Sequence, residues 1–211
     1  MRGILISFEA GEGAGKGTQV SLLKEYLEKK GFKVLLTREP GGLPLPEALR
    51  KEVQHPDKEH TPEGELLLFS TARYLHAKDK IKPALEKGMI VITDRLHDST
   101  TVYQGYAGGI DINFIKQVHK VALGDIMPDL TIFIDIDPEL GLKKMTTNEF
   151  GKPDRMESKG LEFHKKVREG YLTLAKLEPD RIKVIKYRDG DIEGMQNEIR
   201  DYVDKLLEIK E

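Results

Sequence analysis

The residues with the clearest chemistry form a glycine-rich run that follows an apolar segment near the N-terminus. Residues 9–18 read Glu-Ala-Gly-Glu-Gly-Ala-Gly-Lys-Gly-Thr, and a segment with helical periodicity follows directly. Glycines let successive backbone N–H groups turn towards phosphate oxygens, the helix N-terminus adds positive potential, and Lys16 neutralises charge near a transferred phosphoryl group. The combination of strand, loop, Gly-Lys and helix predicts a Walker A phosphate loop and disfavours a plain glycine turn.

Two positions of this loop depart from the usual pattern G-x-x-x-x-G-K-[ST]. Ala10 stands at the first glycine position, so we expect a backbone conformation there that tolerates a β-carbon. Gly17 has no hydroxyl for Mg²⁺, which leaves either Thr18 as the nearest protein ligand or phosphates and water alone. The residues expected to bind nucleotide phosphates are Gly11, Glu12, Gly13, Ala14, Gly15, Lys16, Gly17 and Thr18.

A second group with phosphate chemistry follows the apolar run at residues 89–93. Asp94 and Arg95 come directly after it and are therefore expected at the carboxyl end of a strand. An aspartate there suits Mg²⁺ bound through water, and an arginine offers phosphate oxygens a bidentate fork. A surface salt bridge is the alternative for this pair.

An aromatic residue and a cation are spaced to address one ligand. Phe69 and Arg73 lie four residues apart in a segment with helical periodicity, so they share one face of the expected helix. The alternative is that Phe69 belongs to the helix core and that Arg73 is a solvated charge.

The elements that position these residues alternate short apolar runs with longer helix-period segments, which is typical of a parallel sheet covered by helices. Residues 38–45 and 147–158 lack a regular apolar period and are polar or rich in glycine and proline, so both are expected to be functional loops. A ligand crevice is expected at the carboxyl ends of the strands. Asp135 is expected to cap the helix that begins near Pro138. The predicted strands are residues 4–8, 33–37, 89–93, 130–135 and 182–187. The predicted helices are residues 18–30, 46–53, 63–86, 111–123, 138–146, 159–177 and 192–208.

Composition restricts the class of protein. A chain of 211 residues accommodates one α/β domain, and the absence of cysteine excludes disulfides, thiolate metal sites and cysteine nucleophiles. A net charge of -2 gives no general attraction to nucleic acid. No apolar run approaches the length of a membrane span and no secretory signal is visible, so we expect a cytoplasmic protein without a membrane partner.

Further motifs, in their order and spacing, resemble bacterial and archaeal thymidylate kinases over nearly the whole chain. These motifs are Thr37-Arg38-Glu39-Pro40-Gly41-Gly42, Glu65-Leu66-Leu67-Leu68-Phe69-Ser70-Thr71-Ala72-Arg73, Asp94-Arg95, Tyr103-Gln104-Gly105 and Pro128-Asp129-Leu130-Thr131. The resemblance implies a P-loop NTPase fold with a five-stranded parallel sheet, helices on both faces and a lid. It also implies one nucleoside monophosphate kinase domain over residues 1–211, Mg²⁺ as cofactor, a homodimer, and the reaction of ATP with dTMP to give ADP and dTDP.

The resemblance also implies how the acceptor base is recognised. In the family the phenylalanine stacks on thymine and the arginine donates to O4, which assigns these roles to Phe69 and Arg73. Thymine has an acceptor at position 4 where cytosine has a donor, and a guanidinium only donates, so cytosine should be rejected. Gln104 is expected to reach the base edge.

The sugar and phosphate of dTMP are assigned by the same resemblance. Tyr103 is expected to pack beside the sugar C2 and to exclude a ribose hydroxyl, and Glu12 to face the 3′-hydroxyl. Arg38, Pro40 and Arg95 complete the expected dTMP site, with Arg50 as a weaker candidate for the phosphate.

The predicted lid supplies cations that the P-loop lacks. Because residues 12–15 contain no arginine, the resemblance implies basic residues from a lid at about residues 147–158, where Lys152 and Arg155 stand. The catalytic residues are thus expected to be Lys16, Arg95 and Arg155.

Two alternatives stay open at this point. The run at residues 15–19 reads like the P-loop of adenylate kinase, but the Asp-Gly-Phe-Pro-Arg run expected in that family is replaced by Asp94-Arg95-Leu96. A non-catalytic nucleotide switch would carry a guanine-reading Asn-Lys-x-Asp run, which the sequence lacks.

Overall fold

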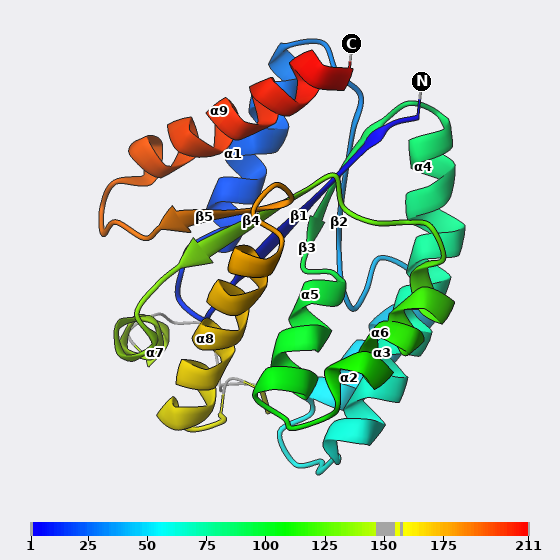
Figure 1. Cartoon of the computed structure of the whole chain (residues 1–211), viewed down its shortest axis with the longest axis vertical. Helices are drawn as coiled ribbons and strands as arrows, with labels where there is room; N and C mark the ends of the chain where they lie inside the picture. The colour runs from blue at the N-terminus through cyan, green and yellow to red at the C-terminus, as the bar shows by residue number, and fades with distance from the viewer. Residues whose placement is uncertain (1, 147–154, 157, 211) are drawn as a thin grey trace.

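The centre of the molecule is a parallel sheet of five strands. The structure is a computed structural model that describes residues 2–146, 155, 156 and 158–210. The strands lie in the order β2-β3-β1-β4-β5, and every pair is parallel (Figure 1). The five predicted strands are therefore confirmed. Their bounds are β1 Ile4–Ala10, β2 Val34–Arg38, β3 Ile90–Asp94, β4 Leu130–Asp135 and β5 Ile182–Lys186.

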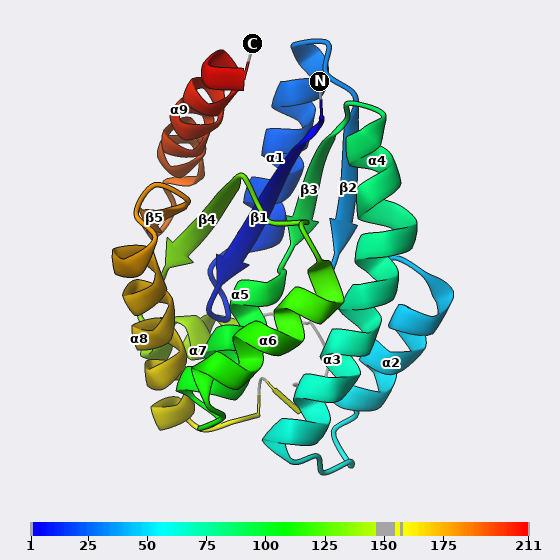
Figure 2. The ribbon, with the colours of Figure 1, turned by 45° about the vertical axis from the view of Figure 1, so that its right-hand side comes forward.

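Helices cover both faces of this sheet (Figures 1 and 2). The longer ones are α1 Lys16–Lys29, α2 Pro44–Gln54, α3 Pro62–His76, α6 Ile112–Leu123, α7 Pro138–Thr146, α8 Leu161–Leu177 and α9 Ile192–Lys210. The shorter ones are the π-helical segment η1 Ala77–Ile81, α4 Lys82–Glu86, α5 His97–Thr100 and a second π-helical segment, η2 Thr101–Tyr106.

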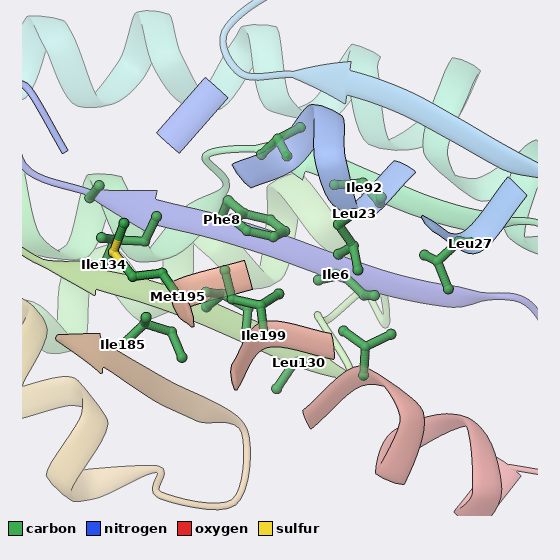
Figure 3. Packing of buried hydrophobic residues seen from close by; sticks show 14 of the residues in the cluster. Ile6, Phe8, Leu23, Leu27, Ile92, Leu130, Ile134, Ile185, Met195 and Ile199 are labelled. Carbon is green, nitrogen blue, oxygen red and sulfur yellow. The ribbon is translucent and has the colours of Figure 1, made fainter. Parts of the chain in front are cut away.

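Alternation along β1 assigns its side chains to two different cores. Ile6 and Phe8 belong to the cluster formed with α1 and α9, and Figure 3 shows Leu23 and Ile199 of those helices packed on this face. Leu5 belongs instead to the cluster formed with η1, α4 and α6. Since successive side chains of a strand point to opposite faces, Ser7 and Glu9 lie on the same side as Leu5. Both are fully buried, which places a carboxylate inside the layer of helices.

The predicted helix at residues 63–86 is one continuous helical stretch with a π-helical segment in its middle. Pro83 stands in the first turn of α4 and has no N–H to donate to the preceding turn. The widened segment η1 immediately before it accommodates that missing hydrogen bond.

The segment α5–η2, residues 97–106, was not predicted to be helical. It lacks an apolar period because most of its buried side chains are polar. Their partners come from distant elements: Asp98 accepts from Arg181 at 2.7 Å, and Gln104 donates to Glu65 at 2.7 Å. Tertiary hydrogen bonds rather than periodicity therefore stabilise this segment.

The predicted cap of α7 was wrong. Asp137 accepts from the backbone N–H of Glu139 at 3.0 Å and so caps the helix. Asp135 instead forms two hydrogen bonds with Arg168 of α8, at 2.6 and 3.0 Å. Asp135 ends β4, from where its side chain reaches α8 rather than the N-terminus of α7.

Within the described part of the chain, no helix is both long enough and apolar enough to span a bilayer.

Candidate active site

The carboxyl ends of β1, β2 and β3 open into a cleft of about 230 Å³. Residues from the glycine loop, β2, α2, α3, β3 and the α5–η2 segment contribute to its wall. The wall includes all eight residues predicted to bind dTMP, namely Glu12, Arg38, Pro40, Phe69, Arg73, Arg95, Tyr103 and Gln104. It also includes Lys16, Asp94 and the weaker candidate Arg50. The structure thus brings Glu12 and Gln104, which are 92 positions apart in the sequence, to one site.

The glycine loop between β1 and α1 needs its glycines for conformation and for space. Gly13 and Gly15 have φ angles of 69° and 70°, in the left-handed region. A β-carbon on Gly13 would lie 2.4 Å from the carbonyl oxygen of Gly141. Ala10 is the last residue of β1 and has no positive φ, which confirms that its β-carbon is tolerated.

Lys16 and Asp94 form a direct ion pair at the phosphate end of the cleft. Burial, with Arg95 nearby, lowers the pKa of the Lys16 ammonium. Burial acts to raise the pKa of Asp94, but Lys16 and Arg95 outweigh it, and the pKa falls below its ordinary value. The Asp94 carboxylate is therefore ionised, and Arg50 adds to the positive potential around it.

Arg95 holds a strained backbone conformation at the end of β3. Its φ of 68° makes it the one non-glycine residue with positive φ in the described part of the chain. Such a conformation costs about 1 to 3 kcal/mol and persists only when its surroundings enforce it. The guanidinium donates to Glu12 at 3.2 Å and lies 5.2 Å from the ring centre of Tyr103. Tyr103 also donates to Glu12 at 3.2 Å, so the three side chains form one cluster beside the glycine loop.

At the other end of the cleft, Arg73 donates hydrogen bonds to three groups, and one of its guanidinium nitrogens is left without a partner among the described residues. Its Nε donates to Glu39 at 2.7 Å, and its Nη2 donates to the hydroxyl of Thr100 at 2.9 Å and to the carbonyl of Leu96 at 3.2 Å. Nη1 has no hydrogen-bond partner among the described residues. A rigid guanidinium whose Nη1 is still free to donate suits an acceptor atom on a bound ligand.

Glu39 orients this arginine from a buried position. Burial acts to raise the pKa of its carboxyl, but Arg73 and His76 outweigh it and lower the pKa. The second carboxylate oxygen lies 3.0 Å from Nδ1 of His76, whose Nε2 lies 2.7 Å from the hydroxyl of Thr37. A buried chain of polar groups thus runs from β2 to the arginine in the cleft.

The side chain of Arg155 packs against α2 and α3 and is not part of the wall of the cleft. It forms an ion pair with Glu65 at 2.7 Å and donates to the carbonyl of Val53 at 2.9 Å. Lys159 lies 3.4 Å from the same Glu65 carboxylate. Of the predicted lid, only residues 155, 156 and 158 are described, and Lys152 lies outside the described residues.

Arg38 is bound at the rim of the cleft by a surface partner. Its guanidinium donates to Glu47 at 3.0 Å, and its side chain is 53% exposed. Arg50 donates to the carbonyl of Pro40 at 3.1 Å. Both arginines line the cleft, and an anionic ligand would meet them at its open side.

The carboxylates that organise the site were not predicted to have a role. Glu9, Glu39 and Glu65 are at most 3% exposed, and each contacts a residue that lines the cleft. Glu39 and Glu65 stand inside motifs quoted above, and Glu9 directly precedes the glycine loop. Their positions within or next to motifs were the only available signal, since a charged residue is ordinarily exposed.

Comparison with known proteins gives a consistent result along the chain. The family model described as "Thymidylate kinase" matches residues 8–199. A thymidylate kinase of Symbiobacterium thermophilum is 42% identical over 205 residues, which cover 97% of this chain and 94% of that protein. One of Thermoanaerobacter pseudethanolicus is 44% identical over 209 residues, which cover 98% of this chain and 100% of that protein. The crystal structure of a thymidylate kinase from Ehrlichia chaffeensis superposes with a TM-score of 0.77 and 34% identity, covering 96% of this chain and 99% of that one.

Proposed function

The chain belongs to the thymidylate kinase family and phosphorylates dTMP, and we propose how its residues bind the two substrates and transfer the phosphoryl group. One observation carries the proposal. A single cleft joins Lys16 of the glycine loop to the Phe69 and Arg73 pair of α3. The comparisons do not favour the adenylate-kinase-like alternative or a nucleotide switch.

The base of dTMP is placed at the α3 end of this cleft. Phe69 offers its ring for stacking, and Nη1 of Arg73 donates to O4 of thymine. The absence of any described partner for Nη1 supports this role, because a buried unsatisfied donor is unfavourable until a ligand accepts from it. Gln104 faces the base edge while its amide nitrogen is held by Glu65.

The sugar and phosphate of dTMP lie towards the glycine loop. Glu12 and Tyr103, which share a hydrogen bond, face the deoxyribose. Arg95 binds the phosphate from inside the cleft, and Arg38 and Pro40 approach it from the rim. This order puts the dTMP phosphate next to the loop where ATP is expected.

ATP is assigned to the backbone N–H groups of residues 11–18. An oxygen of the dTMP phosphate attacks the γ-phosphorus of ATP, the bond to the bridging β-phosphate oxygen breaks, and ADP leaves with that electron pair. Lys16 and Arg95 stabilise the negative charge on the transferred group, since such transfer depends on positioning and electrostatics. Lys16 must exchange its present partner Asp94 for phosphate when ATP binds.

The residues near the loop fit Mg²⁺ only together with nucleotide. Asp94 and Thr18 offer the oxygen donors that this ion prefers. Within the described residues there is no cluster of three or more acidic or histidine side chains that could hold a metal unaided. When bound, the ion would neutralise phosphate charge and orient the phosphoryl group. Phosphates and water are therefore its main ligands in this proposal.

Arg155 is proposed as the lid cation of the reaction. To reach the transferred group it must leave Glu65 and the carbonyl of Val53, where it is now bound. The remainder of the proposed lid, including Lys152, belongs to the same single kinase domain of residues 1–211.

A homodimer is proposed from an apolar surface on two neighbouring helices. Leu67 and Tyr74 of α3 are 60% and 44% exposed, and Phe114 and Val121 of α6 are 47% and 78% exposed. Each pair is spaced by seven residues and thus shares one face of its helix. Because α3 and α6 lie side by side (Figure 2), we assign both pairs to one apolar interface with a second copy of the chain. The proposed location is the cytoplasm, which cell fractionation would check.

A substrate panel tests the function directly. The protein is incubated with Mg²⁺ and ATP together with dTMP, dUMP, AMP, CMP or GMP, and ADP release is measured. We expect the highest kcat/KM with dTMP and none above background with CMP. Activity confined to AMP, or ATP binding without phosphorylation of any monophosphate, would overturn the proposal.

A further inference from the structure

Glu9 is a buried carboxylate that receives four hydrogen bonds directly behind the glycine loop. Its side chain is completely inaccessible to solvent. Oε1 accepts from the hydroxyl of Ser7 at 3.0 Å and from the N–H of Leu96 at 2.8 Å. Oε2 accepts from the hydroxyls of Ser99 at 2.5 Å and of Tyr171 at 2.8 Å. Burial raises the pKa of this carboxyl, but four donors directed at its two oxygens suit the ionised form.

One of these bonds holds the strained backbone at Arg95. The N–H of Arg95 donates to the carbonyl of Phe8 at 2.9 Å, and its carbonyl accepts from the hydroxyl of Thr93 at 2.8 Å. The next N–H, that of Leu96, donates to Glu9. Hydrogen bonds on both sides of the residue thus enforce its left-handed conformation. Without the carboxylate, the N–H of Leu96 would lose its partner and the turn would lose one of three constraints.

Two more of the four bonds, those from Ser99 and Tyr171, link Glu9 to the side chain of Arg95. Its Nη1 donates to Ser99 at 3.2 Å and to Tyr171 at 3.4 Å, the two hydroxyls that donate to Oε2 of Glu9. A hydroxyl has one hydrogen and two lone pairs, and an ionised carboxylate only accepts. Both hydroxyls donate to the Glu9 carboxylate, and each keeps a lone pair that can accept from the guanidinium. The two hydroxyl oxygens also lie 2.9 Å from each other, so the three groups form one hydrogen-bonded cluster around Oε2.

We propose that Glu9 is a positioning residue that aims Arg95 at the phosphate of dTMP through the N–H of Leu96 and the hydroxyls of Ser99 and Tyr171. Glu9 itself contacts no substrate and does not line the cleft. The inference rests on the proposed function, in which Arg95 binds that phosphate.

The test compares a ligand that carries the phosphate with one that lacks it. Dissociation constants of dTMP and thymidine are measured by calorimetry for the wild type, Glu9→Gln, Arg95→Ala and the double variant. Because a hydrogen bond to a charged group is worth roughly a factor of ten or more, Glu9→Gln should weaken dTMP about tenfold and thymidine less than about twofold. In the Arg95→Ala background, Glu9→Gln should have no further effect on either ligand.

Ser7→Ala is the matched control, because Ser7 bonds to the same carboxylate but not to Arg95. It should leave both affinities within about twofold of the wild type. Should Glu9→Gln fail to fold, the double variant Ser99→Ala/Tyr171→Phe removes the two hydroxyls instead, and the same selective loss of dTMP affinity is expected. Circular dichroism establishes that each variant is folded.

The outcomes separate this inference from the proposed function. An equal loss for dTMP and thymidine, or the same loss in the Arg95→Ala background, would show a merely structural role and overturn the inference alone. If Arg95→Ala left the dTMP affinity unchanged, the assignment of Arg95 to the phosphate would fail, and the inference with it.

Discussion

Replacing Arg73 by lysine should remove the proposed contact with thymine O4 while preserving the buried ion pair with Glu39. The guanidinium uses Nε for Glu39 and Nη2 for Thr100 and Leu96, which leaves Nη1 for the base. A lysine has a single nitrogen, and Glu39, which is only 3% exposed, will hold that charge. The variant therefore tests base recognition without leaving an unpaired buried carboxylate.

The size of the effect follows from the one bond that is lost. A hydrogen bond from a charged donor contributes about 1.5 to 3 kcal/mol, so kcat/KM for dTMP should fall about 10- to 150-fold in Arg73→Lys. The matched analogue is 5-methyl-dCMP, which keeps the methyl group and differs at position 4, where it presents a donor. Its kcat/KM should not fall, because it makes no bond with Nη1 of Arg73.

The assay is ADP release with each nucleotide, and its readout is the ratio of the two kcat/KM values. Arg73→Leu serves as the stability control, since it removes the arginine partner of the buried Glu39, leaves only His76 beside that carboxylate, and should lower the free energy of unfolding by about 3 to 5 kcal/mol. Arg73→Lys should lower it by much less. If the ratio does not change in Arg73→Lys, either because neither value falls or because both fall equally, the reasoning is refuted.

Three further results are expected. Arg155→Ala should lower kcat at least about tenfold with little change in KM for dTMP, because a contact made only in the transition state is lost. An unchanged turnover number in steady-state assays would refute the assignment of Arg155. Burial, with help from nearby cations, lowers the pKa of His119 to about 2 in the folded protein. Below about pH 6.5 the unfolded chain alone gains this proton, so the unfolding free energy should fall by up to about 1.4 kcal/mol per pH unit from this residue. Urea titrations at pH 7, 6 and 5 should show a shallower fall in His119→Gln, and identical slopes would contradict the argument. Val121→Asp should convert the proposed dimer to a monomer in sedimentation velocity, and a dimer that persists would place the interface elsewhere.

Much of the fold was predictable because local periodicity and punctuation determine it. All five strands were found within about two residues of their ends, since parallel strands buried on both faces are continuous apolar runs. Gly31 and Gly88 each stand between a helix and a strand, where a sequence marks the end of the helix, and have φ angles of 92° and 71°. The glycine loop was readable for the same reason, because phosphate binding by backbone N–H groups requires glycines at fixed spacing.

Segments stabilised by distant partners were not predictable. The α5–η2 segment has no apolar period and depends on Arg181 and Glu65, which lie far away in the sequence. The cap of α7, by contrast, could have been predicted, because Asp137 directly precedes Pro138, the first residue of the helix, whereas Asp135 ends β4.

By itself, then, the sequence determined the five strands, the longer helices and the phosphate loop, because these depend on local spacing. The residues expected to bind the two substrates came from the resemblance of the motifs to thymidylate kinases. Only the tertiary structure decided how the cleft is held in shape. Glu9, Glu39 and Glu65 look like ordinary charged residues in the sequence, yet each is buried against groups that line the cleft. A buried charge is stable only where packing brings several donors to it, and that meeting of remote residues is not encoded in any local pattern.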